Sequence, residues 1–574
     1  MTGTGDSARL VTALVHTREA LQRAALPLDL PGVDEARATR LEMIDQLEDY
    51  VLPRLIQIDA PLLAVVGGST GAGKSTLVNT LVGDRVTEPG VLRPTTRSPV
   101  MVHNPADAEW FDEARILPDL ERTSRASADP GALQLVASDQ VPQGLAILDA
   151  PDIDSVEERN RTLAAQLLAA ADLWLFVTSA ARYADQVPWD FLKQAAERSA
   201  AVAIVLDRTP PDAVQEVSGH LARMLTARGL RDSPLFTVTE STVDEAGLLP
   251  AESVSEIRRW LDELGADAAA RTSVIRQTLQ GAIRSIASRS HTVADACAEQ
   301  EQMLGRLRDD VIRSYARAVA EVDEASADGT LLRGEVLARW QEFVGTGELL
   351  KALESRVSWL RDRLTDALRG KPQQAGRVSV AVESGLQTLI LEHAEAAAER
   401  AAASWSSVQA GRQLLEGGED ISRASRDLRQ RAERAVRDWQ SGVLDMVRTE
   451  GAGKRSTARF LAYGFNGLAV ALMVVVFAST AAIPTGAEVG IGAGTAMVGQ
   501  KVLEAVFGDQ AVRRLATAAR TDLQRRVEEL MAVERARFER RLDALDLHAD
   551  AADRLRSAAR TVDDERYAHR GAVQ

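Results

Sequence analysis

The residues best suited to do chemistry stand in one short run, GGSTGAGKST, at positions 67–76. The run fits the pattern G-x-x-x-x-G-K-[ST] and lies between an apolar stretch and a stretch with helical spacing. Glycines let successive backbone N–H groups point at phosphate oxygens, and the following helix presents its positive end to the same anion. Lys74 would reach the terminal phosphates and Ser75 would offer a hydroxyl to Mg²⁺. We therefore expect a nucleotide-binding loop formed by Gly68, Ser69, Thr70, Gly71, Ala72, Gly73, Lys74, Ser75 and Thr76.

A carboxylate for the metal follows a second apolar strand. The segment 145–148, LAIL, runs directly into Asp149, which places this carboxylate at the end of a strand. There Asp149 would hold the Mg²⁺ shell through a water molecule. The alternative is an aspartate in a surface turn, and the preceding strand favours the metal role.

A loop between these two motifs, RPTTRSP at 93–99, carries two adjacent hydroxyls. Hydrolysis of a terminal phosphate uses a hydroxyl from a loop that becomes ordered when nucleotide binds. Thr95 and Thr96 both fit, the residues do not choose between them, and an ordinary loop is the alternative. The candidate catalytic residues are thus Lys74, Thr95, Thr96 and Asp149, and the candidate metal ligands are Ser75, Thr96 and Asp149.

The elements that must position these residues are short apolar runs that alternate with helix-length segments. Continuous apolar strands separated by helices are typical of a buried, mostly parallel sheet. We therefore expect a doubly wound α/β head. Its predicted strands are Leu62–Gly67, Val100–His103, Leu145–Leu148, Leu173–Thr178, Ala201–Leu206 and Pro234–Val238.

Most of the remaining chain has apolar residues at helical spacing, as in the stripe formed by Leu304, Leu307 and Val311. This spacing predicts a long α-helical stalk or bundle beside the head. We expect N-terminal helices that pack with the stalk at 1–58, the P-loop domain at 59–266, a helical neck and stalk at 267–450, a membrane-inserting hairpin at 458–508, and a returning stalk helix and tail at 509–574.

The composition excludes several classes of function. A net charge of −15 argues against a general nucleic-acid binder, which needs a basic face. Cys297 is the only cysteine, so the chain can form no internal disulfide and a cysteine-ligated metal is not expected. The N-terminus lacks a charged start followed by an apolar core, so we expect no secretory signal and a cytosolic body.

One segment is apolar enough to enter a membrane. Residues 460–483 contain 24 residues without a charge, which as a helix would span about 36 Å. Basic residues flank both ends of the wider segment, so both ends are expected on the cytoplasmic face. The sequence therefore predicts a hairpin in the cell membrane, with head and stalk on the cytoplasmic side and arginines that attract anionic lipids. Whether it makes one span or two stays open.

Taken with the order of elements, these motifs resemble the dynamin superfamily, and specifically the bacterial dynamin-like proteins. The resemblance rests on GGSTGAGKST followed by LVNTLVG, on PTTRSP and on ILDAPD, and it is specific only within 62–152. It implies a GTPase head that converts GTP to GDP with Mg²⁺, self-association of heads, and stalk motions that remodel membranes. By the same resemblance Lys74 and Ser75 bind phosphate and Mg²⁺, and Asp149 is the aspartate of the second switch. A second GTPase of the same family is a further partner that the resemblance suggests.

The chain departs from the family pattern at three places. Asp152 stands where the second switch usually ends in glycine, and Thr70-Gly71 replaces a glutamine-serine pair of many animal members. The guanine-reading motif [NT]-K-x-D is replaced by DRTP, so that Asp207 and Arg208 take the first two positions and Pro210 the last. Asp207 and Arg208 remain candidate nucleotide-binding residues, and guanine is chosen on resemblance more than on residues.

Two functions of different classes follow from these observations. The first is a dynamin-like GTP hydrolase that couples head dimerisation and stalk motion to membrane binding or remodelling. The second is a weakly hydrolysing nucleotide-binding scaffold that recruits partner proteins to the membrane, which the departures at Asp152 and Pro210 motivate. A transport ATPase is disfavoured, because the chain has no LSGGQ-like signature and no paired acidic residue after the Asp149 strand.

Overall fold

The computed structural model describes residues 3–87, 98–112, 120–125, 131–155, 158–197, 200–327, 372–416, 418–452 and 507–571, with scattered single positions between them. The chain divides into two compact units. Unit 1 comprises Met1–Leu26, Pro31–Glu299 and His548–Gln574, and unit 2 comprises Pro27–Leu30 and Gln300–Leu547.

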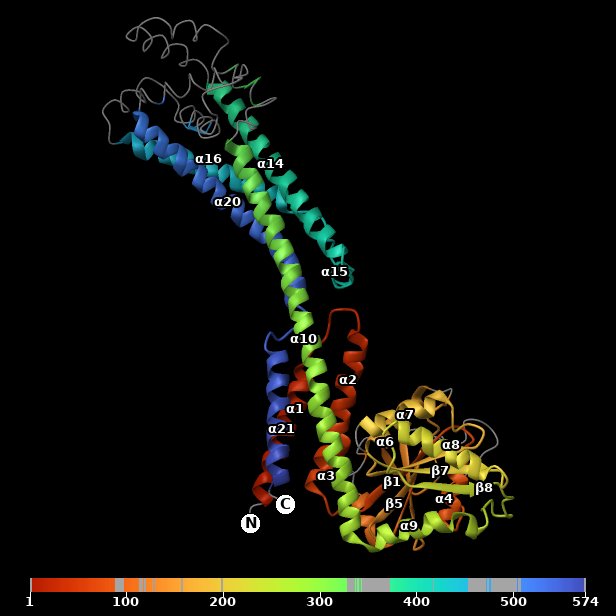
Figure 1. The fold of residues 1–574 in the computed structure, drawn as a ribbon. Coiled ribbons are helices and arrows are strands. Elements are labelled where there is room, and N and C mark those ends of the chain that lie inside the picture. The colour runs from red at the N-terminus through yellow and green to blue at the C-terminus, as the bar shows by residue number, and fades with distance from the viewer. Residues whose placement is uncertain are drawn as a thin grey trace, which may run out of the picture. The chain divides into compact units, whose positions relative to one another are not determined.

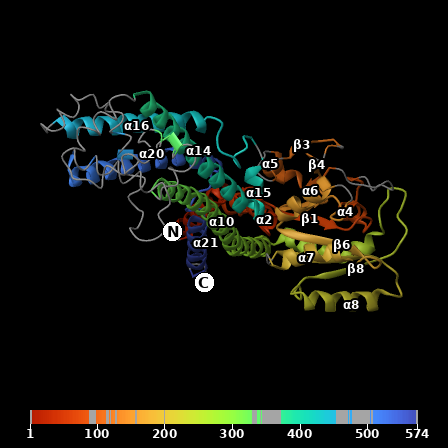
Figure 2. The ribbon, with the colours of Figure 1, turned by 90° about the horizontal axis from the view of Figure 1, so that it is seen from above.

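Unit 1 contains a sheet of eight strands in the order β3-β4-β2-β5-β1-β6-β7-β8. Figures 1 and 2 show this sheet with helices around it. Every neighbouring pair is parallel except β2 and β5, which are antiparallel. Strands β1, β5 and β6 are buried along their whole length, as their unbroken apolar runs require. The strands are β1 Leu62–Gly68, β2 Val100–His103, β3 Glu121–Thr123, β4 Ala132–Ala137, β5 Leu145–Asp149, β6 Leu173–Ser179, β7 Ala201–Thr209 and β8 Leu235–Thr239.

Helices cover both faces of this sheet, so the predicted doubly wound, mostly parallel α/β head is confirmed. Along β1, Leu63 and Val65 pack into the layer under α6, α7 and α8, while Ala64 and Val66 pack into the layer under α4 and α9. Figure 2 shows α8 beside β8, the last strand of the sheet. The helices of the head are α4 Lys74–Val82, α5 Ala108–Asp112, α6 Glu158–Ala169, α7 Gln186–Glu197, α8 Val214–Ala227 and α9 Ser255–Ala266, with short 3-10 turns at Pro105–Asp107 and Ala251–Val254.

Further helices of unit 1 join the head at the edge where β1 and β6 begin. Asp172, directly before β6, accepts hydrogen bonds from Arg54 Nε at 3.0 Å, Arg54 Nη2 at 2.6 Å and the Leu63 backbone at 2.8 Å. Tyr50 donates its hydroxyl to the same carboxylate at 3.1 Å, and Thr278 bonds to the Asp172 carbonyl at 2.9 Å. Tyr50, Arg54 and Thr278 belong to a π-helical turn Leu47–Val51, to α3 Leu52–Ile56 and to α10 Ala268–Ala327. The other helices of this part of unit 1 are α1 Gly3–Arg23, which packs against both α2 Val33–Gln46 and α21 Ala551–Gly571.

Unit 2 consists of helices in its described part. Its core holds Tyr315, Trp405 and Phe538, whose rings lie edge to face across three helices. Trp405 donates to the Leu307 carbonyl at 3.0 Å and Trp439 to the Ala519 carbonyl at 2.8 Å, so both indoles are satisfied between helices. The helices are the second half of α10, α14 Pro372–Ser406, α15 Gln409–Leu415, α16 Leu428–Ala452 and α20 Asp509–Asp543.

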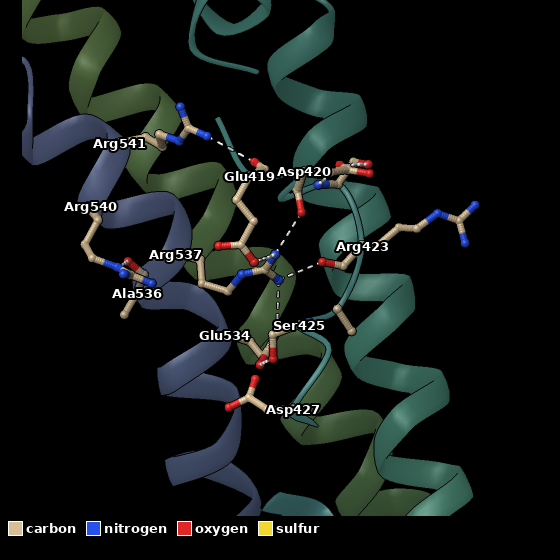
Figure 3. A network of polar contacts seen from close by, with 12 residues as sticks. Glu419, Asp420, Arg423, Ser425, Asp427, Glu534, Ala536, Arg537, Arg540 and Arg541 are labelled. Atoms are coloured by element: carbon tan, nitrogen blue, oxygen red, sulfur yellow. Dashed lines mark hydrogen bonds and ion pairs between the residues drawn. The ribbon is translucent and has the colours of Figure 1, made fainter. Parts of the chain in front are cut away.

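A polar network ties the segment between α15 and α16 to α20 (Figure 3). Arg537 on α20 donates to the backbone carbonyls of Asp420 at 2.9 Å and Arg423 at 2.7 Å. Glu534, whose side chain is fully buried, accepts the Ser425 backbone N–H at 2.8 Å and pairs with Arg431. Since the segment has no regular structure of its own, these bonds satisfy its backbone and fix its course.

The predicted strands are all present, although β3 and β4 were not predicted. Both are short, and β4 is only half-buried, so neither has a continuous apolar run. Among the described residues no helix has the length and apolarity needed to cross a bilayer. The predicted membrane hairpin at 458–508 falls almost wholly outside the described residues, so it stays a prediction.

Candidate functional site

The phosphate loop joins β1 to α4, as the spacing predicts. Two of its glycines are required by close contacts. A Cβ on Gly68 would lie 2.0 Å from the Val177 carbonyl oxygen of β6, and a Cβ on Gly73 would lie 2.0 Å from Asp207 Oδ2. Gly73 also has φ +97°, a left-handed conformation that starts α4 and that side chains disfavour. The loop therefore packs closely against the ends of two neighbouring strands, with the N-terminus of α4 beside it.

Lys74 is held inside this loop by three contacts. Its Nζ donates to the backbone carbonyls of Gly68 at 3.0 Å and Ser69 at 3.1 Å, and it forms an ion pair with Asp152. Both side chains of the pair are only 4% exposed. Asp152 thus supplies the negative charge that a terminal phosphate would supply in a nucleotide complex. This pairing was not predicted, since the sequence showed only that Asp152 replaces a glycine.

Ser75 and Asp149 meet beside the lysine. The Ser75 hydroxyl donates to Asp149 Oδ2 at 2.7 Å, while Asp149 Oδ1 is buried and has no hydrogen-bond partner among the described residues. Burial raises the pKa of Asp149 to about 6, and the charge of Asp152 adds to this, against the Ser75 hydrogen bond and the charge of Lys74. A buried carboxylate with one unpaired oxygen next to a hydroxyl fits Mg²⁺, which prefers such oxygen ligands.

A second charged pair supports the outer side of the loop. Asp154 accepts from the Thr70 backbone N–H at 2.6 Å and from the Thr70 hydroxyl at 2.7 Å. Arg182 pairs with Asp154 at 2.8 Å and also donates to the Thr70 carbonyl at 2.8 Å. Burial opposes ionisation of Asp154, but the Thr70 bonds and the Arg182 charge outweigh it and hold its pKa below the usual value. Sequence reasoning missed both residues, because neither belongs to a motif.

Asp207 and Arg208, at the end of β7, both lie beside Gly73 of the phosphate loop but differ in exposure. Asp207 is 3% exposed, whereas Arg208 is exposed, and a Cβ on Gly73 would lie 3.8 Å from Arg208 Nε. Burial raises the pKa of Asp207 to about 6, partly offset by the Arg208 backbone N–H at 2.7 Å and by the Arg208 charge. Asp207 therefore packs against the phosphate loop, and its role in binding nucleotide stays a prediction.

The other predicted residues are placed as follows. Gly71, Ala72 and Thr76 lie in the loop and the first turn of α4, and the buried Ser69 hydroxyl has no hydrogen-bond partner among the described residues. Thr95 and Thr96 lie outside the described residues.

One hydroxyl near the metal position was missed by sequence reasoning. Thr87 is 4% exposed, donates to the Ser75 carbonyl at 3.3 Å and helps to lower the pKa of Asp149. It precedes the RPTTRSP loop and fits no motif. In the described part of the chain no cluster of three or more His, Cys, Asp or Glu could hold a metal ion. Mg²⁺ in nucleotide sites commonly takes most of its ligands from phosphate and water.

A parallel sheet whose first strand leads through a glycine-rich loop into a helix, with a buried lysine, serine and aspartate, defines a P-loop nucleotide-binding domain. Residues 63–207 of the chain also match the family model described as Dynamin family. Over these residues the head is therefore similar to the GTPase domains that this family model describes.

Three further likenesses extend this comparison. The chain is 24% identical over 153 residues to a probable transmembrane GTPase, FZO-like, chloroplastic, of Arabidopsis thaliana, and the match spans 27% of this chain and 16% of that protein. Two solved chains of an oligomerised bacterial dynamin pair are 12% identical, covering 71% and 72% of this chain and 79% and 80% of theirs, with TM-scores of 0.26 and 0.29. Toc33 of Arabidopsis thaliana, solved with Mg²⁺ and GMPPNP, is 16% identical over 41% of this chain and 94% of its own, with a TM-score of 0.24. TM-scores this low carry nothing over to this chain.

Proposed function

We propose that the chain is a dynamin-like GTP hydrolase that couples nucleotide turnover in its head to membrane binding or remodelling. The observation that carries the hydrolase is the buried group of Lys74, Ser75 and Asp149 at the junction of β1, β5 and α4. Backbone N–H groups of the loop and the Lys74 ammonium would bind the phosphates. The dynamin-family match of residues 63–207 supports guanine as the base.

Ser75 and Asp149 would hold Mg²⁺, which when bound neutralises charge on the phosphates. The protein's own residues prepare the site for this. Asp207 and the Asp154–Arg182 pair fix the loop from both sides, so its amides need little rearrangement on binding. Lys74 must exchange Asp152 for a phosphate oxygen, which frees the segment that follows Asp149 to move. This exchange links phosphate binding to a change of loop conformation.

The membrane part of the proposal rests on the apolar segment 460–483 and its flanking basic residues. The matched Arabidopsis protein is named a probable transmembrane GTPase. We extend this to the present chain as a membrane location with the head on the cytoplasmic side. Anionic lipids, a second copy of the head and a second dynamin-like GTPase are the proposed partners.

Phosphate release from GTP, with and without vesicles that contain anionic lipid, tests the hydrolase directly. Lys74→Ala should abolish release, because no other described cation takes the place of Lys74 in the loop. Lys193→Ala is the matched control, since Lys193 is an exposed lysine on α7 of the same domain and should change nothing. Release that continues unchanged in Lys74→Ala would contradict the proposal.

A nucleotide-binding scaffold with little turnover is the second candidate. It is favoured by the Lys74–Asp152 pair, because binding must displace a buried carboxylate, and by Pro210 in place of the base-reading aspartate. Single-turnover measurement separates the two candidates. A protein that binds GTP and recruits vesicles but releases no phosphate within hours would be the scaffold.

A further inference from the structure

The head has no carboxylate at the position where GTPases of this kind read guanine. Pro210 stands there, directly after β7, and a proline side chain cannot accept hydrogen bonds. Asp207 on the same strand end is buried against Gly73 and supports the phosphate loop. A carboxylate that reads guanine must therefore come from another residue near this strand end.

The neighbouring strand β8 ends beside the end of β7, and a carboxylate follows it directly. β7 and β8 are parallel, and their register pairs Thr209 with Thr239. The next residue, Glu240, donates its backbone N–H to the Thr209 carbonyl at 2.9 Å. Glu240 therefore leaves the carboxyl edge of the sheet beside the place that Pro210 occupies. Ligands of open α/β sheets bind at this edge.

The Glu240 side chain is available for a ligand. It is exposed, and within the described ranges no hydrogen bond or ion pair engages its carboxylate. Two other carboxylates at this end of the strands are already used. Asp185 pairs with Arg182 at 2.8 Å, and Asp244 accepts the Leu248 backbone N–H at 2.8 Å.

Asp212 is also exposed and unpaired in the described part of the chain, but its position is less suitable. It follows the Pro210–Pro211 pair inside a turn closed by the Ala213 N–H and the Pro210 carbonyl at 3.0 Å. That turn leads the chain away from the strand end toward α8. Asp212 therefore serves as a matched control for Glu240.

We propose that Glu240 is the specificity-determining residue for guanine, in place of the missing carboxylate at position 210. Its two oxygens accept hydrogen bonds from N1–H and the 2-amino group of guanine, as carboxylates do with paired donors. Adenine offers no donor at N1 and no 2-amino group, so the same carboxylate rejects it. The proposal rests on the proposed function, since it assumes that the P-loop holds the phosphates of the same nucleotide.

Binding of four nucleotides to the full chain tests this role: GTP, inosine triphosphate, xanthosine triphosphate and ATP. Inosine lacks the 2-amino group, and xanthosine carries a carbonyl there. The native chain should prefer GTP over inosine triphosphate by about 10- to 100-fold, the range for one bidentate contact. Glu240→Gln should lose this preference and gain affinity for xanthosine triphosphate, because an amide offers one acceptor and one donor.

The control and the contrary outcomes separate this proposal from the proposed function. Asp212→Asn should keep the native order of affinities, and the thermal midpoints of both variants should match the native one because both side chains are exposed. Unchanged preference for GTP in Glu240→Gln, while Lys74→Ala weakens GTP binding, overturns the role of Glu240 alone. If the native chain binds neither GTP nor ATP, the proposed function fails and this role fails with it.

Discussion

Two buried ion pairs lie in the head, one at the end of the sheet where its central strands β1 and β6 begin and one at the opposite end. They differ in how many hydrogen bonds their carboxylates accept. At the edge where strands begin, both oxygens of Asp172 are bonded by Arg54, and Tyr50 and the Leu63 backbone add two more donors. At the opposite edge, Asp152 pairs with Lys74, whose remaining contacts go to backbone carbonyls. Both pairs are almost fully buried, at 6% and 3% exposed for the first and 4% for each partner of the second.

The difference separates a structural pair from an exchangeable one. A buried carboxylate is costly unless its hydrogen bonds are complete, and the Asp172 site meets that requirement with protein groups alone. Next to Lys74, in contrast, Asp149 Oδ1 and the Ser69 hydroxyl are buried without partners in the described part of the chain. Unsatisfied polar atoms around a paired cation are what a phosphate-binding site needs before its ligand arrives. The Arg54–Asp172 pair therefore stabilises the fold, whereas the Lys74–Asp152 pair belongs to a site prepared for phosphate.

The largest effect should come from breaking the structural pair. Arg54→Met leaves Asp172 buried and unpaired at the start of β6, so the free energy of unfolding of the head should fall by about 3–5 kcal/mol. Hydrogen exchange at the amides of β1 and β6, measured in the full chain, reports this loss. Arg554→Met removes one partner of an exposed pair at the start of α21, 53% and 56% exposed, and should leave the free energy of unfolding close to the native value. Equal effects of the two variants would mean that Asp172 finds other partners.

Lys74→Met should show the opposite balance between stability and binding. Asp152 belongs to the segment after β5 that has no regular structure, so its carboxylate can turn toward water, and we expect a stability loss of about 1–2 kcal/mol. Nucleotide affinity should fall by roughly 100-fold or more, because charge-assisted bonds to phosphate are lost. Titration with a fluorescent GTP analogue and thermal unfolding of the same sample give both quantities. A stability loss as large as that of Arg54→Met would make the Lys74 pair structural as well.

The contrast between the two edges also explains what the sequence could predict. The phosphate loop, the Asp149 strand and the six apolar strands follow local patterns, and the structure shows these elements. The Lys74–Asp152 and Arg54–Asp172 pairs join residues 78 and 118 positions apart, and no local pattern encodes such contacts. Asp207 was predicted to bind nucleotide from its place in a motif. That role stays a prediction, and the packing of Gly73 against Asp207, which no local pattern encodes, shows that this residue also supports the loop.

Removing the Asp152 carboxylate, which competes with phosphate for Lys74, tests whether this pair is exchangeable. Asp152→Gly restores the residue that the family pattern has at this position, and Lys74 would then bind phosphate without first losing a carboxylate. Affinity for GTP should rise about tenfold, or ~1.4 kcal/mol. Asp152→Asn keeps the size of the side chain without its charge, so it tests whether charge or bulk is displaced. Weaker binding in both variants would show that Asp152 helps to hold the nucleotide.

The smallest expected effect concerns Asp207. It is buried like Asp172, but its pKa is raised from 3.8 to about 6. The folded head then binds this proton more tightly than the unfolded chain, so stability from this group is present below about pH 4 and is lost as pH rises to about 6. The full shift corresponds to about 3 kcal/mol, and movement of the exposed Arg208 toward the carboxylate should reduce it to about 1 kcal/mol.

Asp207→Asn, which keeps the acceptor for the Arg208 N–H, should remove this part of the pH dependence and leave the chain more stable at pH 7. Thermal unfolding between pH 4 and 7 measures it, and an unchanged slope would show that another group, such as Asp149 with its pKa of about 6, carries the dependence.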